Sequence, residues 1–347
     1  MTENKTVVMY SRKGKVSESF SEILRERSKR SLTLARRSIL SGNVQTERAR
    51  SALDYYTSNW QIFVHPGLFS MACEAVGGRP EETVLMQTVI SMLAAGFDVH
   101  DDVIDNSEVK HDKPTVLGKF GKEMAILLGD AFLIRAFVLL GQLAEPIEKG
   151  KFKEILDSLQ NCLFELGDAH VLELELRENS SMSSTLALQV VKMKAASAAA
   201  DMRVGAIVGG GTKGEIETLT EYGRYVGMLS TLRDEFIDLY EVDELRQRVK
   251  NEYPPIPVLY ACKDLKAKKT ILSILSEERP TKRDLEKLRV IAFKAAETEG
   301  LTEQMRNLYK LAEKLSNKLK QSPVKSLLQS LLEALLEDVP MHGALDP

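Results

Sequence analysis

One stretch decides the expected fold: Gly96-Phe97-Asp98-Val99-His100-Asp101-Asp102-Val103-Ile104-Asp105-Asn106. It ends a long apolar segment at helical spacing and places four aspartates within eight positions. On a helix, the spacing i, i+3, i+4 and i+7 puts all four carboxylates on one face. Like charges at that spacing repel one another unless a cation joins them. The run therefore predicts a helix whose acidic end binds hard divalent cations.

A second acidic cluster, Arg233-Asp234-Glu235-Phe236-Ile237-Asp238, ends another helical segment far downstream. Mg²⁺ prefers a few carboxylates together with water and substrate phosphates to a cage made wholly of protein. Two such clusters facing each other would bind several cations and a diphosphate, whose departure the cations would favour. A single acidic i, i+4 pair is more often a solvated surface, and spacing alone leaves both interpretations open.

Helical periodicity runs through most of the chain, and no segment shows sustained strand alternation. We therefore expect an all-α protein, a single large bundle of about a dozen helices with a buried centre. The 44% hydrophobic content suffices for such a core. The 47 basic residues nearly balance the 50 acidic ones, so no nucleic-acid partner is expected.

Several features indicate a cytoplasmic protein. The three cysteines, Cys73, Cys162 and Cys262, form no metal-spaced cluster and no disulfide framework. The N-terminus lacks the apolar core of a signal peptide. The apolar run 125–144 contains Asp130 and Arg135, which favours a buried helix and no membrane span.

Segments around both clusters occur in an order and at spacings typical of one family. They are the runs Glu74–Gly78, His100–Ser107, Lys113–Val116, Phe120-Gly121, Ala125–Asp130, Lys194–Ala196, Tyr222–Gly227, Asp234–Asp238 and Pro255–Ala261. Together they resemble the trans-isoprenyl diphosphate synthase (polyprenyl synthetase) family. The resemblance implies one isoprenoid synthase-like domain over residues 1–347 around a central cavity, with divergent N-terminal helices (1–60) and C-terminal helices (266–347). It also implies a homodimer and three Mg²⁺ ions that hold an allylic diphosphate.

The resemblance assigns roles to individual residues. The direct metal ligands and catalytic residues would be Asp101, Asp105 and Asp234, with Lys194 steadying the allylic diphosphate. Supporting metal ligands would be Asp102, Glu235 and Asp238. Ionisation of the allylic substrate, attack by isopentenyl diphosphate and loss of a proton would lengthen the chain by five carbons.

The chain departs from the family where isopentenyl diphosphate would bind. The family's Gly-Lys-Arg run is replaced by Gln61–Pro66, in which only His65 offers positive character. The paired arginines after the first motif are replaced by Lys110-His111, which lack the planar fork that grips phosphate. Lys110, Lys113 and His65 remain as candidate substrate-binding residues. The leaving-group half of the site is therefore expected to be intact and the acceptor half depleted.

Two further candidates lie beside the first motif. Phe97 stands four residues before Asp101, where an aromatic residue in the family limits product length, although an ordinary core role fits equally well. Asp98 replaces a usually apolar residue, and a fourth acid would need a partner. We expect Asp98 to reach a cation, its water shell or a compensating lysine.

Three functions remain open on these grounds. The first is a Mg²⁺-dependent synthase of short-chain prenyl diphosphates. The second is an enzyme of the same fold that ionises a prenyl diphosphate without isopentenyl diphosphate, cyclising the cation or passing it to another acceptor. The third is a non-catalytic partner subunit of a synthase.

Overall fold

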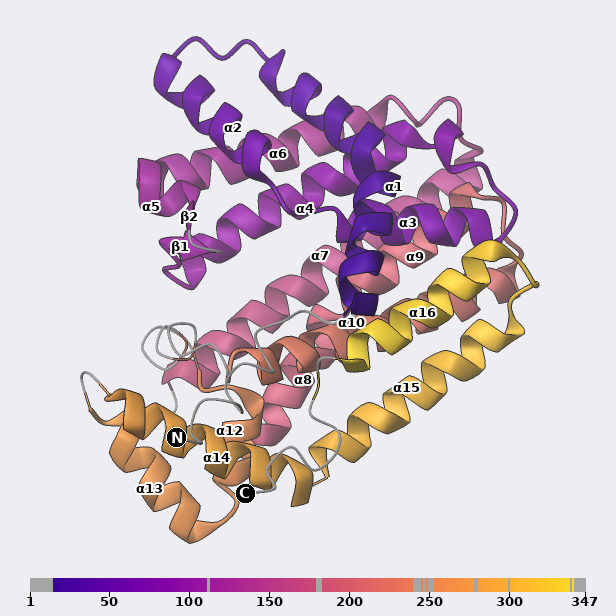
Figure 1. Cartoon of the computed structure of the whole chain (residues 1–347). Helices are drawn as coiled ribbons and strands as arrows, with labels where there is room; N and C mark the ends of the chain where they lie inside the picture. The colour runs from indigo at the N-terminus through magenta and orange to yellow at the C-terminus, as the bar shows by residue number, and fades with distance from the viewer. Residues whose placement is uncertain are drawn as a thin grey trace. The chain divides into compact units, whose positions relative to one another are not determined.

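The computed structural model describes residues 15–110, 113–178, 183–239, 245, 248, 253–277, 280–298, 300–337 and 339. Helices account for most of them (Figure 1). The sheet structure in this part of the chain is one small antiparallel hairpin, β1 (Val109–Lys110) paired with β2 (Lys113–Pro114). The expected all-α fold is therefore confirmed.

The chain divides into two compact units. Unit 1 comprises Met1–Phe20, Gln160–Ala199 and Thr218–Pro347, and unit 2 comprises Ser21–Leu159 and Ala200–Glu217. The boundaries fall within helices α1 (Lys15–Leu40), α7 (Lys149–Glu178), α9 (Ala196–Val208) and α10 (Lys213–Ile237). The assignment of residues 1–347 to one domain remains a prediction.

Unit 2 is built on the pair α4 and α6. This pair consists of α4 (Val84–Ile104) and α6 (Lys122–Gly141). Further elements of unit 2 are α2 (Glu47–Asn59), α3 (Val64–Ala75), η1 (Pro80–Glu82) and α5 (Val116–Phe120). Glycines let α4 and α6 approach closely, because a Cβ on Gly96 would lie 2.7 Å from Leu133 Cγ and one on Gly129 would overlap the ring of His100. Met92 of α4 and Phe132 of α6 are fully buried in the same hydrophobic core. The helix that ends in the aspartate run therefore has a firm partner.

Unit 1 holds α8 (Ser184–Lys194), α12 (Ile256–Ala261) and the four C-terminal helices. These are α13 (Leu265–Leu275), α14 (Lys282–Thr298), α15 (Leu301–Lys318) and α16 (Pro323–Glu337), drawn in orange to yellow in Figure 1. Helical periodicity interrupted near Pro280, Gly300 and Ser322-Pro323 predicts four amphipathic helices in this part of the chain, and the structure contains them. Tyr222 of α10 donates a buried hydrogen bond of 2.6 Å to the carbonyl of Leu328 on α16.

The structure differs from the expected elements in two places. The alanine-rich segment 185–208 has a composition that predicts one helix, but the structure breaks it at Ala195. Gly227 of α10 lies so close to this point that a Cβ on Gly227 would be 2.9 Å from Ala195. The polar segment 106–118 follows the aspartate run and predicts a loop, but it contains the hairpin and the start of α5. The break at Ala195 lies at a contact with a residue distant in sequence, which a local pattern does not contain. The hairpin joins near neighbours, Val109 with Pro114 and Lys110 with Lys113, but its strands are too short for alternation to be visible.

Helix α6 is less buried than the sequence predicts. Among the described residues it is the one helix long and apolar enough to cross a membrane, and 39% of that apolar window is buried. Its exposed apolar side chains are Ile126, Leu127, Ile134, Phe137 and Val138. The same criteria are met by core helices of soluble proteins, so this is weak support for a span.

All three cysteines are buried.

Candidate active site

The acidic end of α4 keeps its helical geometry as far as Asp105. The Asp105 N–H donates to the Asp101 carbonyl at 2.9 Å, so the two side chains lie one turn apart. Asn106 then adopts a left-handed conformation (φ 52°), which asparagine tolerates better than most residues. The Ser107 N–H returns to the Asp102 carbonyl at 2.8 Å. The helix thus ends in a turn that sends the chain back toward its own acidic face.

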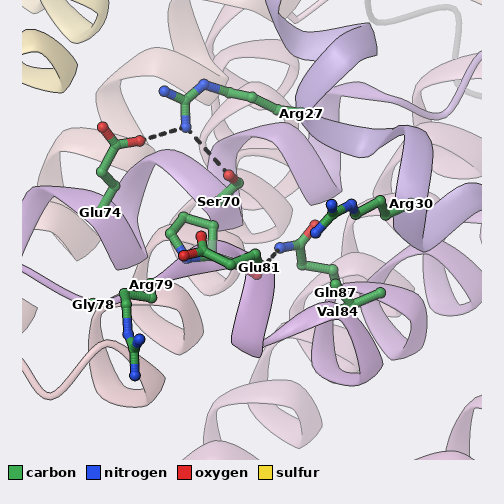
Figure 2. Close-up of a pocket in the computed structure, with 10 residues that line it drawn as sticks. Arg27, Arg30, Ser70, Glu74, Gly78, Arg79, Glu81, Val84 and Gln87 are labelled. Atoms are coloured by element: carbon green, nitrogen blue, oxygen red, sulfur yellow. Dashed lines mark hydrogen bonds and ion pairs between the residues drawn. The ribbon is translucent and has the colours of Figure 1, made fainter.

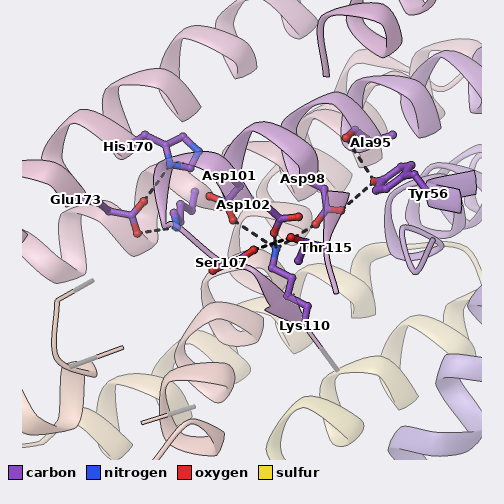
Figure 3. A network of polar contacts seen from close by, with 11 residues as sticks. Tyr56, Ala95, Asp98, Asp101, Asp102, Ser107, Lys110, Thr115, His170 and Glu173 are labelled. Atoms are coloured by element: carbon purple, nitrogen blue, oxygen red, sulfur yellow. Dashed lines mark hydrogen bonds and ion pairs between the residues drawn. The ribbon is translucent and has the colours of Figure 1, made fainter. Parts of the chain in front are cut away.

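The β1–β2 hairpin after this turn carries Lys110 onto the aspartates. Its Nζ lies 2.6 Å from Asp102 Oδ1, 3.4 Å from Asp98 Oδ1 and 4.0 Å from Asp101 Oδ2 (Figure 3). Thr115 fixes the hairpin, because its N–H donates to the Glu108 carbonyl and its hydroxyl to the Ser107 carbonyl. The structure therefore brings Lys110, Asp98, Asp101 and Asp102 together.

Burial and charge shift the protonation of this cluster. Burial raises the pKa of Asp102 to about 7, although Lys110 acts to lower it. Burial also opposes the charge of Lys110, but Asp98, Asp102 and Asp101 outweigh that effect and raise the pKa of this lysine. Lys110 is therefore a firmly charged ammonium that offsets part of the repulsion between the aspartates.

Asp98 has two partners in the structure. Tyr56 of α2 donates a hydrogen bond of 2.9 Å to Asp98 Oδ2, and Lys110 reaches the other oxygen (Figure 3). Burial and the Asp98 charge raise the pKa of Tyr56 well above its ordinary value, so the phenol remains a donor. A compensating lysine was one of the three partners expected for Asp98. Sequence reasoning missed Tyr56, because nothing local links it to a residue 42 positions away.

The second acidic cluster, in unit 1, is organised by an arginine. Arg248 lies 2.9 Å from Glu235 and 2.5 Å from Asp238. Glu235 is buried and also accepts the Ile256 N–H at 2.7 Å. Asp234 is the exposed member and pairs with Arg233 at 3.2 Å. Glu235 and Asp238 are thus brought together by Arg248, a residue that the sequence did not single out.

Lys194 ends α8 and forms an ion pair with Glu173 of α7 at 2.6 Å. His170, one turn earlier on α7, lies 3.2 Å from the same carboxylate (Figure 3). Burial alone would raise the pKa of Glu173, but the contacts with His170 and Lys194 hold it below its ordinary value. The ionised glutamate therefore fixes the position of the Lys194 ammonium.

The remaining candidates lie in unit 2. His65, near the start of α3, forms a close pair with Asp201 of α9, with Nδ1 and Oδ2 2.7 Å apart. Lys113 is exposed and donates to Asn59 Oδ1 at 3.3 Å. Phe97 is half-buried on α4. His111 lies outside the described residues.

The donor set suits Mg²⁺ that completes its shell with water and phosphate oxygens. Asp101 and Asp105 are half-buried and one turn apart, and Asp234 is exposed, so their carboxylates are accessible as hard ligands. Within the described residues, no group of three acidic, histidine or cysteine side chains is arranged to hold a metal ion alone. These described side chains would therefore bind a metal ion only together with water or phosphate oxygens.

A pocket of about 480 Å³ opens elsewhere in unit 2 (Figure 2). Its lining includes Arg27, which contacts Glu74 at 2.7 Å and Ser70 at 3.3 Å. A second lining arginine, Arg79, pairs with Glu82. Because these two guanidinium groups already have carboxylate partners, they offer little unbalanced charge to a ligand.

Comparisons with known proteins agree on one family. The sequence profile described as polyprenyl synthetase matches residues 47–292. A short chain isoprenyl diphosphate synthase of Methanothermobacter thermautotrophicus is 27% identical over 65% of this chain and 66% of its own length. A geranylgeranyl diphosphate synthase of Methanosarcina mazei is 25% identical over 54% of this chain and 57% of its own. The chain thus matches about half to two thirds of the length of these relatives.

Solved structures share the fold. The geranylgeranyl pyrophosphate synthetase of Pyrococcus horikoshii superposes with a TM-score of 0.82 and covers 92% of this chain and 98% of its own, at 23% identity. A decaprenyl diphosphate synthase of Rhodobacter capsulatus gives a TM-score of 0.77 at 21% identity, covering 93% of this chain and 99% of its own. The expected isoprenoid synthase-like architecture is confirmed.

Proposed function

Since the chain belongs to the polyprenyl synthetase family, we propose that it is a prenyltransferase that condenses an allylic prenyl diphosphate with isopentenyl diphosphate. The observation that carries this proposal is the acidic end of α4, where Asp101 and Asp105 stand one turn apart beside the charged Lys110. The relatives named as short-chain and geranylgeranyl diphosphate synthases favour a short product.

In this proposal Asp101, Asp105 and Asp234 are the direct ligands of Mg²⁺. Three ions, when bound, would neutralise the departing diphosphate and so favour cleavage of the carbon–oxygen bond. Asp102, Glu235 and Asp238 support the ligands. The contacts of Asp102 with Lys110, and of the other two with Arg248, balance charge and hold the ends of α4 and α10 in place.

Residues of the chain then handle the substrates. Lys194, fixed by Glu173, donates to the allylic diphosphate. His65, Lys110 and Lys113 supply positive charge to the acceptor, because Ile62, Phe63 and Val64 cannot hold a diphosphate. Phe97 bounds the space for the growing chain. Asp98 acts through Lys110, whose ammonium it helps to hold.

We also propose a cytoplasmic homodimer that uses the exposed apolar side chains of α6. Phe137 and Val138 are each 48% exposed, and burying such side chains in a partner copy is favourable. Phe137→Glu should shift the protein toward monomer in sedimentation velocity. Leu265→Glu on α13 is the matched control, since Leu265 is 77% exposed and lies outside α6. An unchanged dimer in Phe137→Glu would exclude this surface.

The activity is tested with purified protein, Mg²⁺, geranyl or farnesyl diphosphate and labelled isopentenyl diphosphate. Label in a longer prenyl diphosphate supports the proposal. Asp101→Asn should lower turnover by at least about a hundredfold, because a metal ligand is lost, and EDTA should abolish it. Asp157→Asn, an exposed acid paired with Lys153, is the matched control and should remain active.

A second candidate is ionisation of a prenyl diphosphate without isopentenyl diphosphate. The apolar residues at 62–64 favour it, and Ile62 is buried. Release of diphosphate without incorporation of label would support this candidate. Absence of any turnover, together with activation of an added synthase, would instead support a partner subunit.

A further inference from the structure

Asp201 is a buried acid in an alanine-rich helix, and nothing in the proposed reaction yet uses it. It is 4% exposed on α9, where burial of an unpaired carboxylate would be costly. It lies against His65 of α3, with Asp201 Oδ2 2.7 Å from His65 Nδ1. The carboxylate therefore has one clear role in the structure, which is to bind that imidazole.

The packing of α3 on α9 fixes the distance between the two side chains. Phe69 lies one turn after His65, and Gly205 lies one turn after Asp201. A Cβ on Gly205 would overlap the Phe69 carbonyl oxygen, so the two backbones are in direct contact at that level. The pair is thus held by a helix–helix contact that leaves little room for adjustment.

The contact orients the ring and favours its charged form. With Nδ1 directed at Asp201, Nε2 is the edge left for other partners, and the His65 side chain is 32% exposed. Burial opposes the charge, but Asp201, with a smaller contribution from Asp98 of α4, raises the pKa of His65. Burial also raises the pKa of Asp201, although its contact with His65 acts to lower it. Both acids that act on His65 therefore favour the imidazolium.

An anionic acceptor needs that charge. The acidic end of α4 presents Asp98, Asp101 and Asp102, and Lys110 already contacts all three. Of the three residues proposed to supply positive charge to the acceptor, a neutral His65 would leave Lys113 as the one cation not already held by these carboxylates.

We propose that Asp201 is a positioning residue that keeps His65 as an imidazolium, whose Nε2–H donates to a phosphate oxygen of the acceptor. This inference rests on the proposed function. It explains how an acceptor site that lacks the family's Gly-Lys-Arg run retains a fixed cation.

The kinetic test is Asp201→Asn, which keeps the size of the side chain and removes its charge. At pH 8 the KM for isopentenyl diphosphate should rise about tenfold, with kcat and the KM for the allylic substrate within about twofold, because a charge-assisted hydrogen bond is lost. At pH 6 the difference should shrink, since His65 then charges without help. Equal changes in both KM values, or none, would overturn the proposal. Asp157→Asn is the matched control.

A rescue variant separates charge from folding. His65→Arg in the Asp201→Asn background carries a charge at every pH tested, so its KM for isopentenyl diphosphate should be low and independent of pH between 6 and 8. A KM as high as in Asp201→Asn alone would contradict a role for charge at this position.

An assay without turnover keeps the inference separate from the proposed function. In NMR of the histidine side chains, His65 should titrate at higher pH than in Asp201→Asn, and inorganic pyrophosphate at pH 7.5 should shift its Nε2 signal only in the wild type. If the wild type incorporates no label but shows both effects, the proposed function fails and the anion site stands. Identical titration curves in the two proteins would refute the pairing itself.

Discussion

Replacing Arg248 by methionine should destabilise unit 1 more than any exposed charge change, because it strands a buried carboxylate. Arg248 is 7% exposed and Glu235 4%. Removal of one partner of a buried ion pair costs about 3–5 kcal/mol in unfolding free energy. Glu235 keeps the Ile256 N–H at 2.7 Å and the Tyr253 hydroxyl at 3.5 Å. These remaining donors place the expected loss at about 3 kcal/mol, the lower end of that range.

The assay is urea unfolding followed by far-UV circular dichroism, without Mg²⁺. Fluorescence is unsuitable, because the single tryptophan, Trp60, lies in unit 2. The midpoint should fall while the slope m stays constant. Arg306→Met is the matched control, since Arg306 pairs with Glu303 at an exposed site and its loss should cost about 0–1 kcal/mol.

A double variant tests the cause. Glu235→Gln combined with Arg248→Met removes the stranded charge and should recover at least about 1 kcal/mol relative to Arg248→Met alone. If Arg248→Met costs no more than Arg306→Met, or if the double variant is less stable than the single one, the argument from buried charge is wrong.

Three further predictions follow from the contacts already described. Lys110→Met should lower the thermal midpoint of the metal-free protein, because the aspartates lose their ammonium partner. Mg²⁺ should raise the midpoint of this variant more than that of the wild type, since the cation replaces the lost ammonium. An equal rise in the two proteins would contradict this. Gly205→Ala should cost about 1–3 kcal/mol in urea unfolding, because the methyl group meets the Phe69 carbonyl, whereas Gly214→Ala, with open space around it, should cost little. The pKa of Glu173 in the folded protein lies below its ordinary value of 4.5. Its contribution to stability is therefore present above pH 4.5 and is lost as the pH falls through the folded pKa. Glu173→Gln should flatten that part of the curve of unfolding free energy against pH.

The sequence predicted the features of this fold that depend on neighbouring residues. The helix ending in the aspartate run follows from apolar spacing, and the breaks near Pro280 and Gly300 follow from backbone chemistry. The hairpin that carries Lys110 has two residues in each strand, too few for any alternation to be visible. The break at Ala195 depends on the approach of Gly227, which no local pattern records.

Candidate site residues divide in the same way. The aspartate spacing is a local property, and it placed Asp101 and Asp105 one turn apart as expected. The partners that set the charge of the site are distant in sequence: Asp201 is 136 residues from His65, and Arg248 follows Glu235 by 13. Such pairs are selected by tertiary packing. A buried acid in an apolar helix, as at Asp201, was the available signal that a distant base must exist.

The buried cysteines have a practical consequence. Burial raises the pKa of the Cys73 and Cys262 thiols to about 11, so both react slowly with alkylating reagents while the protein is folded. Cys73 lies in unit 2, and Cys162 and Cys262 lie in unit 1. Pulsed alkylation followed by peptide mass spectrometry would therefore measure how fast the thiols of each unit become exposed, without the introduction of further cysteines. The native thiols can thus report local unfolding in each of the two units.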